Sequence, residues 1–378
     1  MNILDDLKKI KKLDQANMLG SIQQFRFQLK QTKEELADLK IPKSYSKVEN
    51  IVVNGMGGSR LGARVAQRLF QDKLKVPVYT VGSYEVPNFV NEKTLLIISS
   101  YSGNTEEVLN TVDEAFKRKA KILIFSQNGK LTQIAREKNL PGYYGFLPQY
   151  NPCNQPRMSL GYQVLGIMIM LSKCRLINIS SQEIDKLIRF IEKIKTKYDI
   201  NVSSTKNLAK KTAKKIHGKI PALIGAEFLM GALHVWRNQT SENSKQTSFY
   251  YEIPELNHYL LEGMGFPKTN SQNLFFIFVK SNLYHLRNQK RIEITKQVLD
   301  GYKIKYSDIQ LTGKTKLEQV FELIQFGSFV SFYLSMLNNL DPSPIPWVDY
   351  FKEQLAHEST RTLKHKNNRT KKQKTKLI

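Results

Sequence analysis

The stretch TLLIISSYSGNTEE (Thr94–Glu107) joins an apolar, β-branched run to a polar turn and the start of a helical pattern. Thr94–Ser100 predicts a buried strand, because the run is short, apolar and bounded by turn residues. Thr105–Lys119 predicts the helix that follows it. A strand that leads through a Ser- and Gly-rich turn into a helix is the repeating unit of an α/β fold, and such turns face the ligand.

The same alternation of strand and helix extends through both halves of the chain. The first half contains predicted strands at Asn50–Met56, Val76–Val81, Thr94–Ser100 and Ala120–Ser126, and a helix at Leu61–Phe70. After a helical stretch over residues 157–215 with a break around Ile177–Ser181, the second half contains predicted strands at Ile220–Ala226, Asn273–Lys280 and Tyr302–Ile309, an extended segment at Ser248–Ile253, and helices at Arg287–Asp300, Lys316–Asn339 and Trp347–His357. Short apolar strands separated by helices indicate parallel sheets covered on both faces.

We therefore predict an α/β fold with two domains, residues 50–175 and 176–357, preceded by a helical arm over residues 1–49 that packs across the pair. Residues 358–378 form a basic tail, because no acid follows Glu358 while eight Lys and Arg residues do. The composition of this tail predicts a disordered segment that contacts nucleic acid weakly and in a salt-dependent way. An inert solubilising end is the alternative.

Composition narrows the class of protein. With 378 residues, 41% of them hydrophobic, the chain has enough apolar material for two cores. Two cysteines, Cys153 and Cys174, provide no disulfide framework and fit a reducing, cytoplasmic compartment. The longest apolar stretch, Leu160–Leu171, is too short for a bilayer, and the six histidines are too scattered to form a metal site. Most of the net charge of +25 is spread thinly, which disfavours a nucleic-acid-binding fold.

The sharpest candidate site is the turn after the strand at Thr94–Ser100. Ser100, Ser102 and Thr105 place hydroxyls around a Gly-Asn turn, where consecutive backbone amides also point outward. A small cluster of donors without a lysine suits a phosphate monoester. The alternative is a helix cap at Thr105, completed by Glu107, but a cap does not require hydroxyls at all these positions.

A second turn, GMGGS (55–59), also follows a strand and begins a helix. Gly57, Gly58 and Ser59 allow close approach of the backbone to an anion. The spacing matches neither a dinucleotide fingerprint nor a P-loop, and glycine-rich turns also occur as purely structural devices.

GMGGS together with SYSGNTEE (100–107) resembles the sugar isomerase (SIS) domain family. Pro156-Arg157, WRNQTSENSK (236–245) and PELNH (254–258) are similar, in the same order, to the signature blocks of the bifunctional phosphoglucose/phosphomannose isomerases. The resemblance implies two SIS-type three-layer α/β/α sandwiches with parallel sheets, a helical N-terminal arm and a C-terminal helix. It also implies a homodimer with the active site at the subunit interface, a small-molecule sugar phosphate as substrate, and no cofactor.

The implied reaction interconverts glucose 6-phosphate, and mannose 6-phosphate, with fructose 6-phosphate through a cis-enediol. It needs a base that moves a proton between C1 and C2 and a group that opens the sugar ring. By the resemblance, Glu242 is the base and His258 opens the ring, with Glu255 as a weaker alternative base. Residue chemistry alone leaves both Glu242 and His258 open to a solvated or structural role.

The resemblance also assigns Arg157 to stabilisation of the enediolate charge and Lys352 to a place near the substrate. Arg60 departs from the family pattern, which has a small residue there. It is expected to add a phosphate contact, to point outward, or to crowd the pocket. A non-catalytic sugar-phosphate-binding regulatory module is the alternative function, although such a module has no use for both Glu242 and His258.

Overall fold

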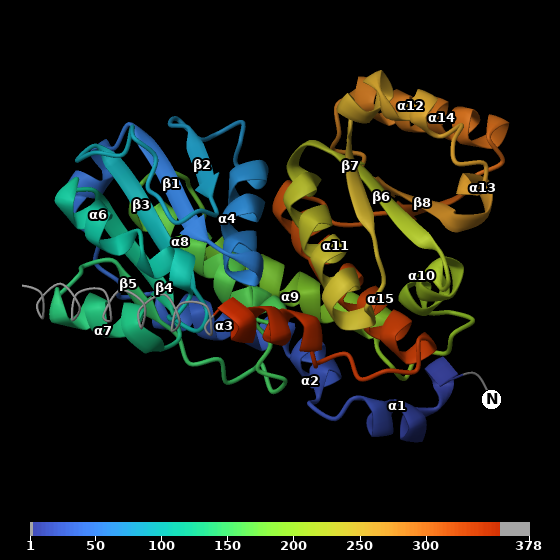
Figure 1. Cartoon of the computed structure of the whole chain (residues 1–378), viewed down its shortest axis with the longest axis horizontal. Coiled ribbons are helices and arrows are strands. Elements are labelled where there is room, and N and C mark those ends of the chain that lie inside the picture. Colours follow the sequence, from blue (N-terminus) through green and yellow to red (C-terminus); the bar gives the residue numbers. More distant parts are fainter. Residues whose placement is uncertain (1–2, 356–378) are drawn as a thin grey trace, which may run out of the picture. The chain divides into compact units, whose positions relative to one another are not determined.

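The computed structural model describes residues 3–355 and divides the chain into two compact units, Met1–Pro342 and Ser343–Ile378. The first unit contains both sheets (Figure 1). In the second unit, residues 346–355 are helical, as the pattern at Trp347–His357 predicts up to the last described residue. The predicted tail over residues 358–378 lies outside the described residues.

The first sheet has the strand order β2-β1-β3-β4-β5, with all neighbours parallel. Its strands are β1 (Asn50–Gly55), β2 (Val78–Val81), β3 (Thr94–Ser100), β4 (Lys121–Ser126) and β5 (Tyr143–Gly145). The first four are confirmed to within two residues at each end. The sequence pattern does not predict β5, because an edge strand of three residues is too short to show a periodicity.

Alternate residues of β3 pack into different cores. Leu95 and Ile97 belong to the cluster that contains residues of α4 (Gly57–Leu69) and α8 (Gly166–Lys173). Leu96 and Ile98 belong to a separate cluster with residues of α5 (Glu106–Leu109), α6 (Val112–Lys117) and α7 (Gly129–Glu137). The sheet therefore has helices on both faces, which confirms the three-layer sandwich.

The helix predicted over Thr105–Lys119 is wrong as a single helix, since it is divided into α5 and α6. Thr111, between them, donates its hydroxyl hydrogen to the Val108 carbonyl at 2.8 Å and accepts a hydrogen bond from the Asn54 amide on β1 at 2.8 Å. A Thr hydroxyl that bonds to the preceding turn bends a helix, and the contact with Asn54 holds the bend against the sheet.

The second sheet has the order β7-β6-β8-β9, again parallel. Its strands are β6 (Ile220–Ala226), β7 (Phe249–Ile253), β8 (Leu274–Lys280) and β9 (Lys305–Gln310), and its main helices are α10 (Leu208–Ile216), α11 (Met230–Ser244), α14 (Leu286–Gly301) and α15 (Lys316–Leu337). Within the described range, α15 alone is long and apolar enough to cross a bilayer, yet 94% of its 18-residue apolar window is buried inside the protein. It is the core helix of this half.

The polar run NQTSENS (238–244) is the last part of α11. Two of its side chains, Gln239 and Asn243, are buried and face the serines of α15. The Gln239 amide donates to the Ser328 hydroxyl at 2.9 Å, and the Asn243 amide donates to the Ser331 hydroxyl at 3.0 Å. A helix segment that makes such polar contacts has the amino-acid composition of a loop. The sequence pattern therefore does not identify it as part of a helix.

The N-terminal arm contacts both halves, as expected. The Gln28 side chain donates to the Met158 carbonyl at 2.9 Å, and Gln325 of α15 donates to the Ile22 carbonyl at 3.0 Å. The arm contains α1 (Leu7–Leu13), α2 (Met18–Gln23) and α3 (Phe25–Glu35); the remaining helices are α9 (Ser181–Tyr198), α12 (Leu260–Gly263) and α13 (Asn270–Asn273). Short 3₁₀ turns lie at Ile3–Asp5, Lys43–Lys47, Pro156–Met158, Glu227–Leu229 and Glu255–His258, with a π-helix at Gly161–Leu165.

The two halves of the first unit meet where α4 and α11 touch backbone to backbone (Figure 1). A Cβ atom on Gly231 would lie 2.6 Å from the Val65 Cα and 2.8 Å from the Arg64 carbonyl oxygen. Any side chain at position 231 must therefore push the two helices apart.

We expect Gly231→Ala to lower the free energy of unfolding by about 1–3 kcal/mol, because overpacking at a backbone contact outweighs the better helix propensity of alanine. Urea denaturation followed by circular dichroism measures this difference. Gly301→Ala is the matched control, since a Cβ at the end of α14 meets nothing within 4 Å. Equal stability of the two variants would contradict the close contact.

Candidate active site

The order of the strands directs attention to one crevice of the first sheet. The chain leaves β1 through α4 to reach β2 on one side, and then returns to β3 on the other side of β1. The loops after β1 and β3 therefore diverge, and open α/β sheets bind ligands in such a crevice at the carboxyl ends of their strands. The GMGGS turn follows β1, and the hydroxyl-rich turn follows β3.

The loop after β3 is held in a tight turn by its own hydroxyls. The Ser100 hydroxyl lies 2.7 Å from the Thr105 hydroxyl and accepts the Gly103 amide at 3.1 Å. The Ser102 hydroxyl is exposed and accepts the Asn104 amide at 3.2 Å. Gly103 has φ +70°, and a Cβ there would lie 1.6 Å from the Asn128 carbonyl oxygen, so only glycine fits.

Thr105 is the residue before α5, but its side chain makes no capping hydrogen bond. Its hydroxyl turns towards Ser100 instead. The capping alternative therefore does not explain this residue. The structure brings the hydroxyls of Ser100 and Thr105 together, whereas that of Ser102 lies in the same loop and contacts the Asn104 amide.

Ser59 links this loop to the GMGGS turn. Its buried hydroxyl accepts the Tyr101 amide at 2.8 Å, and its carbonyl accepts the Ser99 hydroxyl at 2.8 Å. Gly57, with φ +46°, begins the turn. A Cβ on Gly58 would meet the Arg157 backbone nitrogen at 3.4 Å, so a third segment, Pro156-Arg157, packs against the same turn.

Arg157 is the most deeply placed charge at this site, with a side chain that is 1% exposed. Its guanidinium donates to the side chains of Asn243 at 2.6 Å, Gln155 at 2.8 Å and Glu242 at 3.3 Å. It also donates to the Pro342 carbonyl at 3.0 Å. Because these acceptors surround it, the guanidinium is fixed in direction, and one of its nitrogens lies against the carboxylate of Glu242.

Glu242 lies in the last turn of α11 with a side chain that is 30% exposed. Lys245 closes this end of the helix with φ +54°, and its ammonium donates to the carbonyls of Glu242 at 2.9 Å and Pro342 at 3.0 Å. Burial, and after it the charge of Arg157, lowers the pKa of Lys245 to about 8. Lys245 lies in the motif WRNQTSENSK, but its residue type alone indicates no role. In the structure it positions the helix end, and Gln155 and Asn243 support the Arg157–Glu242 pair.

His258 and Glu255 do not join this group within one chain. Both are exposed in the turn Glu255–His258 that follows β7. The last residue of β7, Ile253, pairs with Ala226, which lies before the start of α11. Glu242 lies at the other end of α11, and a 15-residue helix is about 22 Å long. His258 and Glu242 are therefore at opposite ends of the second sheet.

Two further predicted residues belong to other segments of the chain. Lys352 is exposed on the helix over residues 346–355, in the compact unit that begins at Ser343. Arg60 does not point freely into solvent, because its Nη1 lies against Gly82, where an added Cβ would be within 2.3 Å. Burial, and after it the charge of Arg64, lowers the pKa of Arg60.

The second sheet has its own crevice, between β6 and β8, but a carboxylate occupies it. Glu227 follows β6 with φ +51°, which is unusual for a residue with a side chain. Its carboxylate accepts the His285 amide and the Asn288 side chain, each at 2.8 Å. The His285 amide and the Asn288 side chain, which could bind an external anion in this crevice, are already bound to the Glu227 carboxylate. The first crevice is therefore the better candidate for a ligand.

Among residues 3–355, no group of three or more His, Cys, Asp or Glu side chains has the arrangement of a metal site. Cys153 and Cys174 are both buried and unpaired with each other. The side chains described at the site provide hydroxyls and amides, the guanidinium of Arg157, the carboxylate of Glu242 and the ammonium of Lys245.

The fold and the site define the class of protein as a double SIS-domain protein. The family model for the SIS domain matches residues 44–141, and the model for the bacterial phospho-glucose isomerase C-terminal SIS domain matches residues 205–355. A solved structure of a hypothetical protein from Thermus thermophilus has a TM-score of 0.68 at 16% identity, covering 90% of each chain, which supports the fold.

The chain is 33% identical to the bifunctional phosphoglucose/phosphomannose isomerase of Caldicellulosiruptor bescii over 82% of its own length and 90% of that protein. It is 30% identical to the protein of the same name from Aquifex aeolicus, over 83% of its own length and 93% of that protein. The chain belongs to the bifunctional phosphoglucose/phosphomannose isomerase family. The resemblance inferred from the sequence motifs is therefore confirmed.

Proposed function

We propose that this enzyme interconverts glucose 6-phosphate and mannose 6-phosphate with fructose 6-phosphate through a cis-enediol. Membership of the isomerase family supports the proposal. The observation that carries it is the contact of the Glu242 carboxylate, at 3.3 Å, with the buried guanidinium of Arg157. A base beside a fixed cation is what proton abstraction next to a carbonyl requires, because the cation stabilises the negative charge that develops.

In this mechanism the hydroxyls of Ser100, Ser102 and Thr105 bind the phosphate of the sugar, together with the turn at Gly57, Gly58 and Ser59. Glu242 removes the proton from C2 of the open-chain aldose and delivers it to C1. The hydroxyl proton moves from O2 to O1, so that the aldehyde becomes an alcohol and C2 becomes a ketone. Arg157 stabilises the enediolate between these two steps.

The reaction shifts protons within one molecule and transfers no electrons to another, so the proposal includes neither a metal nor an organic cofactor. We also assign the protein to the cytoplasm, in keeping with its buried, unpaired cysteines. The domain boundaries at residues 50–175 and 176–357 remain part of the proposal, and Lys352 remains a proposed substrate contact.

Ring opening needs a second group, and we assign it to His258 of a neighbouring subunit. Within one chain, α11 separates His258 from Glu242, and His258 is exposed at the carboxyl end of β7. A histidine that must act beside Glu242 can reach it only from a second copy of the chain. The proposal therefore includes a homodimer.

We expect the purified protein to form fructose 6-phosphate from each aldose phosphate in a coupled assay that contains a metal chelator. Glu242→Gln keeps the size of the side chain but removes the base, so kcat should fall by at least about 10²-fold while substrate still binds. Glu137→Gln is the matched control, since it removes an exposed carboxylate of α7, and it should keep near-normal turnover.

Normal turnover by Glu242→Gln would exclude Glu242 as the base. Binding of sugar phosphates without turnover by the unmodified protein would support the alternative, a non-catalytic regulatory module, in place of an isomerase.

Replacement of Ser102 and Thr105 by alanine removes two hydroxyls from the proposed phosphate cradle. The KM for glucose 6-phosphate should rise by about tenfold or more, because charge-assisted hydrogen bonds to the phosphate are lost. Steady-state kinetics measure this change. Ser203→Ala, which removes an exposed hydroxyl far from the cradle in sequence, is the control. An unchanged KM in the double variant would place the phosphate elsewhere.

A mixture of Glu242→Gln and His258→Ala subunits tests the shared site. Each variant alone should be weakly active, whereas heterodimers contain one site with both native residues and should recover up to about half of the activity per site of the native protein. The measurement compares activity before and after subunits are mixed, unfolded and refolded together. A monomer in light scattering, or no recovery in verified heterodimers, would contradict this arrangement.

A further inference from the structure

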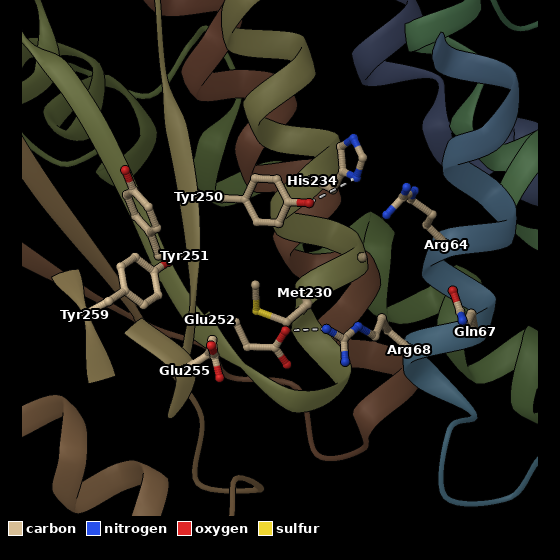
Figure 2. A pocket seen from close by; sticks show the side chains of 11 residues that line it. Arg64, Gln67, Arg68, Met230, His234, Tyr250, Tyr251, Glu252, Glu255 and Tyr259 are labelled. Carbon is tan, nitrogen blue, oxygen red and sulfur yellow. Dashed lines mark hydrogen bonds and ion pairs between the residues drawn. The ribbon is translucent and has the colours of Figure 1, made fainter. Parts of the chain in front are cut away.

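A second cluster of cations lies between the two halves, outside the proposed substrate site. Arg64 of α4, with His234 of α11 and Tyr250 of β7, lines a cleft of about 240 Å³ (Figure 2). Arg60 is one helical turn before Arg64, and Arg237 is about one turn after His234. We call these five residues, Arg60, Arg64, His234, Arg237 and Tyr250, the arginine groove.

The members of the arginine groove hold one another in place. The Arg237 guanidinium donates to Nε2 of His234 at 3.0 Å, and lies 5.4 Å from the centre of the Tyr250 ring. The rings of His234 and Tyr250 stack with centres 5.2 Å apart, and the Tyr250 hydroxyl is 3.4 Å from Nδ1 of His234. These contacts aim the groups at the space beside α4, as Figure 2 shows for His234 and Arg64.

His234 contributes no charge of its own. An arginine always donates, so Nε2 of His234 must be an acceptor and the imidazole must be neutral. Burial, and after it the charges of Arg237, Arg64 and Arg60, lowers the pKa of His234 to about 3. Arg60 is thus close enough to act on the same imidazole as the other two arginines.

The three arginines of the groove are not paired with a carboxylate among residues 3–355, although Glu252 and Glu255 also line the cleft (Figure 2). At the outer end of the cleft, Arg68 forms an ion pair with Glu252 (Figure 2). Arg60, Arg64 and Arg237 form no ion pair with any carboxylate in residues 3–355. The Nε–H groups of Arg64 and Arg237 are buried without an acceptor. Half-buried cations repel one another, and their unpaired N–H donors raise the free energy of the folded state. A bound anion would relieve both effects.

We propose that the arginine groove is a second anion-binding site, separate from the Ser100, Ser102 and Thr105 cradle, and that its ligand is a phosphate group. A phosphate dianion presents several acceptor oxygens, which match three guanidiniums and the Tyr250 hydroxyl better than a single carboxylate does. The size of the cleft suits inorganic phosphate or a small phosphate monoester. The ligand would connect α4, whose first turn contains Ser59, with α11, whose last turn contains Glu242.

The test uses the full chain with Ser102→Ala and Thr105→Ala, so that the substrate cradle does not dominate binding. Inorganic phosphate and glucose 6-phosphate are titrated separately by calorimetry at constant ionic strength. We expect saturable binding of at least one of them. Binding of glucose 6-phosphate identifies a phosphate monoester as ligand, whereas binding of inorganic phosphate alone identifies free phosphate.

Adding Arg64→Gln and Arg237→Gln should weaken this binding by at least about tenfold. Arg189→Gln, which removes an exposed arginine of α9, is the matched control and should leave the affinity unchanged. No saturable binding of either compound, or an affinity within about twofold after both groove arginines are replaced, would overturn the proposal.

A second measurement needs no groove variant and so does not depend on its folding. In the Ser102→Ala/Thr105→Ala protein, bound phosphate should shift the imidazole nitrogen signals of His234 in NMR spectra and raise its pKa, because a dianion offsets the three arginines. The exposed His217 and His285 serve as internal references. A His234 signal that does not respond to phosphate at saturation would likewise overturn the proposal.

Discussion

The buried guanidinium of Arg157 is the constraint around which the site is organised. A cation that is 1% exposed must have acceptors on all sides, since an uncompensated buried charge costs several kcal/mol. Its acceptors come from distant parts of the chain: Gln155 beside it, Glu242 and Asn243 at the end of α11, and the Pro342 carbonyl at the end of the first unit. Satisfying one charge therefore brings the first domain, the second domain and the segment after α15 to one point.

The two sheets are built on the same plan but differ at their crevices. In the first, the loops after β1 and β3 carry glycines and hydroxyls. In the second, Glu227 supplies a carboxylate to the loop amide of His285. The second crevice is thus filled from within the chain, and the second half contributes to the candidate site through α11 instead of through its own loops. This division explains why Glu242, the proposed base, lies at the end of a helix and not at the carboxyl end of a strand.

The arginine groove also depends on the packing of α11. α4 and α11 approach closely at Gly231, and their side chains on either side of this contact face one another. The approach places Arg60, Arg64 and Arg237 around a neutral His234, where like charges meet without forming ion pairs. At the last turn of α11, Glu242 instead meets Arg157 from the turn Pro156–Met158, where opposite charges meet. Helix α11 therefore contacts two electrostatic environments of opposite character.

Local pattern was sufficient to predict most of the fold from the sequence. The apolar runs at Thr94–Ser100 and Ile220–Ala226 are strands with those same bounds, because burial on both faces leaves little freedom in such a segment. The hydroxyl turn was also predictable, since its donors lie within six residues of one another. The tertiary structure alone decided the contacts between residues far apart in the sequence. These are the Arg157–Glu242 pair and the packing of the polar end of α11 against the serines of α15. They also include the helix bend at Thr111, which Asn54 holds, and the placement of Glu242 and His258 at opposite ends of the second sheet. A local pattern reports which face of an element is apolar, whereas the partner of a buried polar group is chosen by the packing of the whole chain.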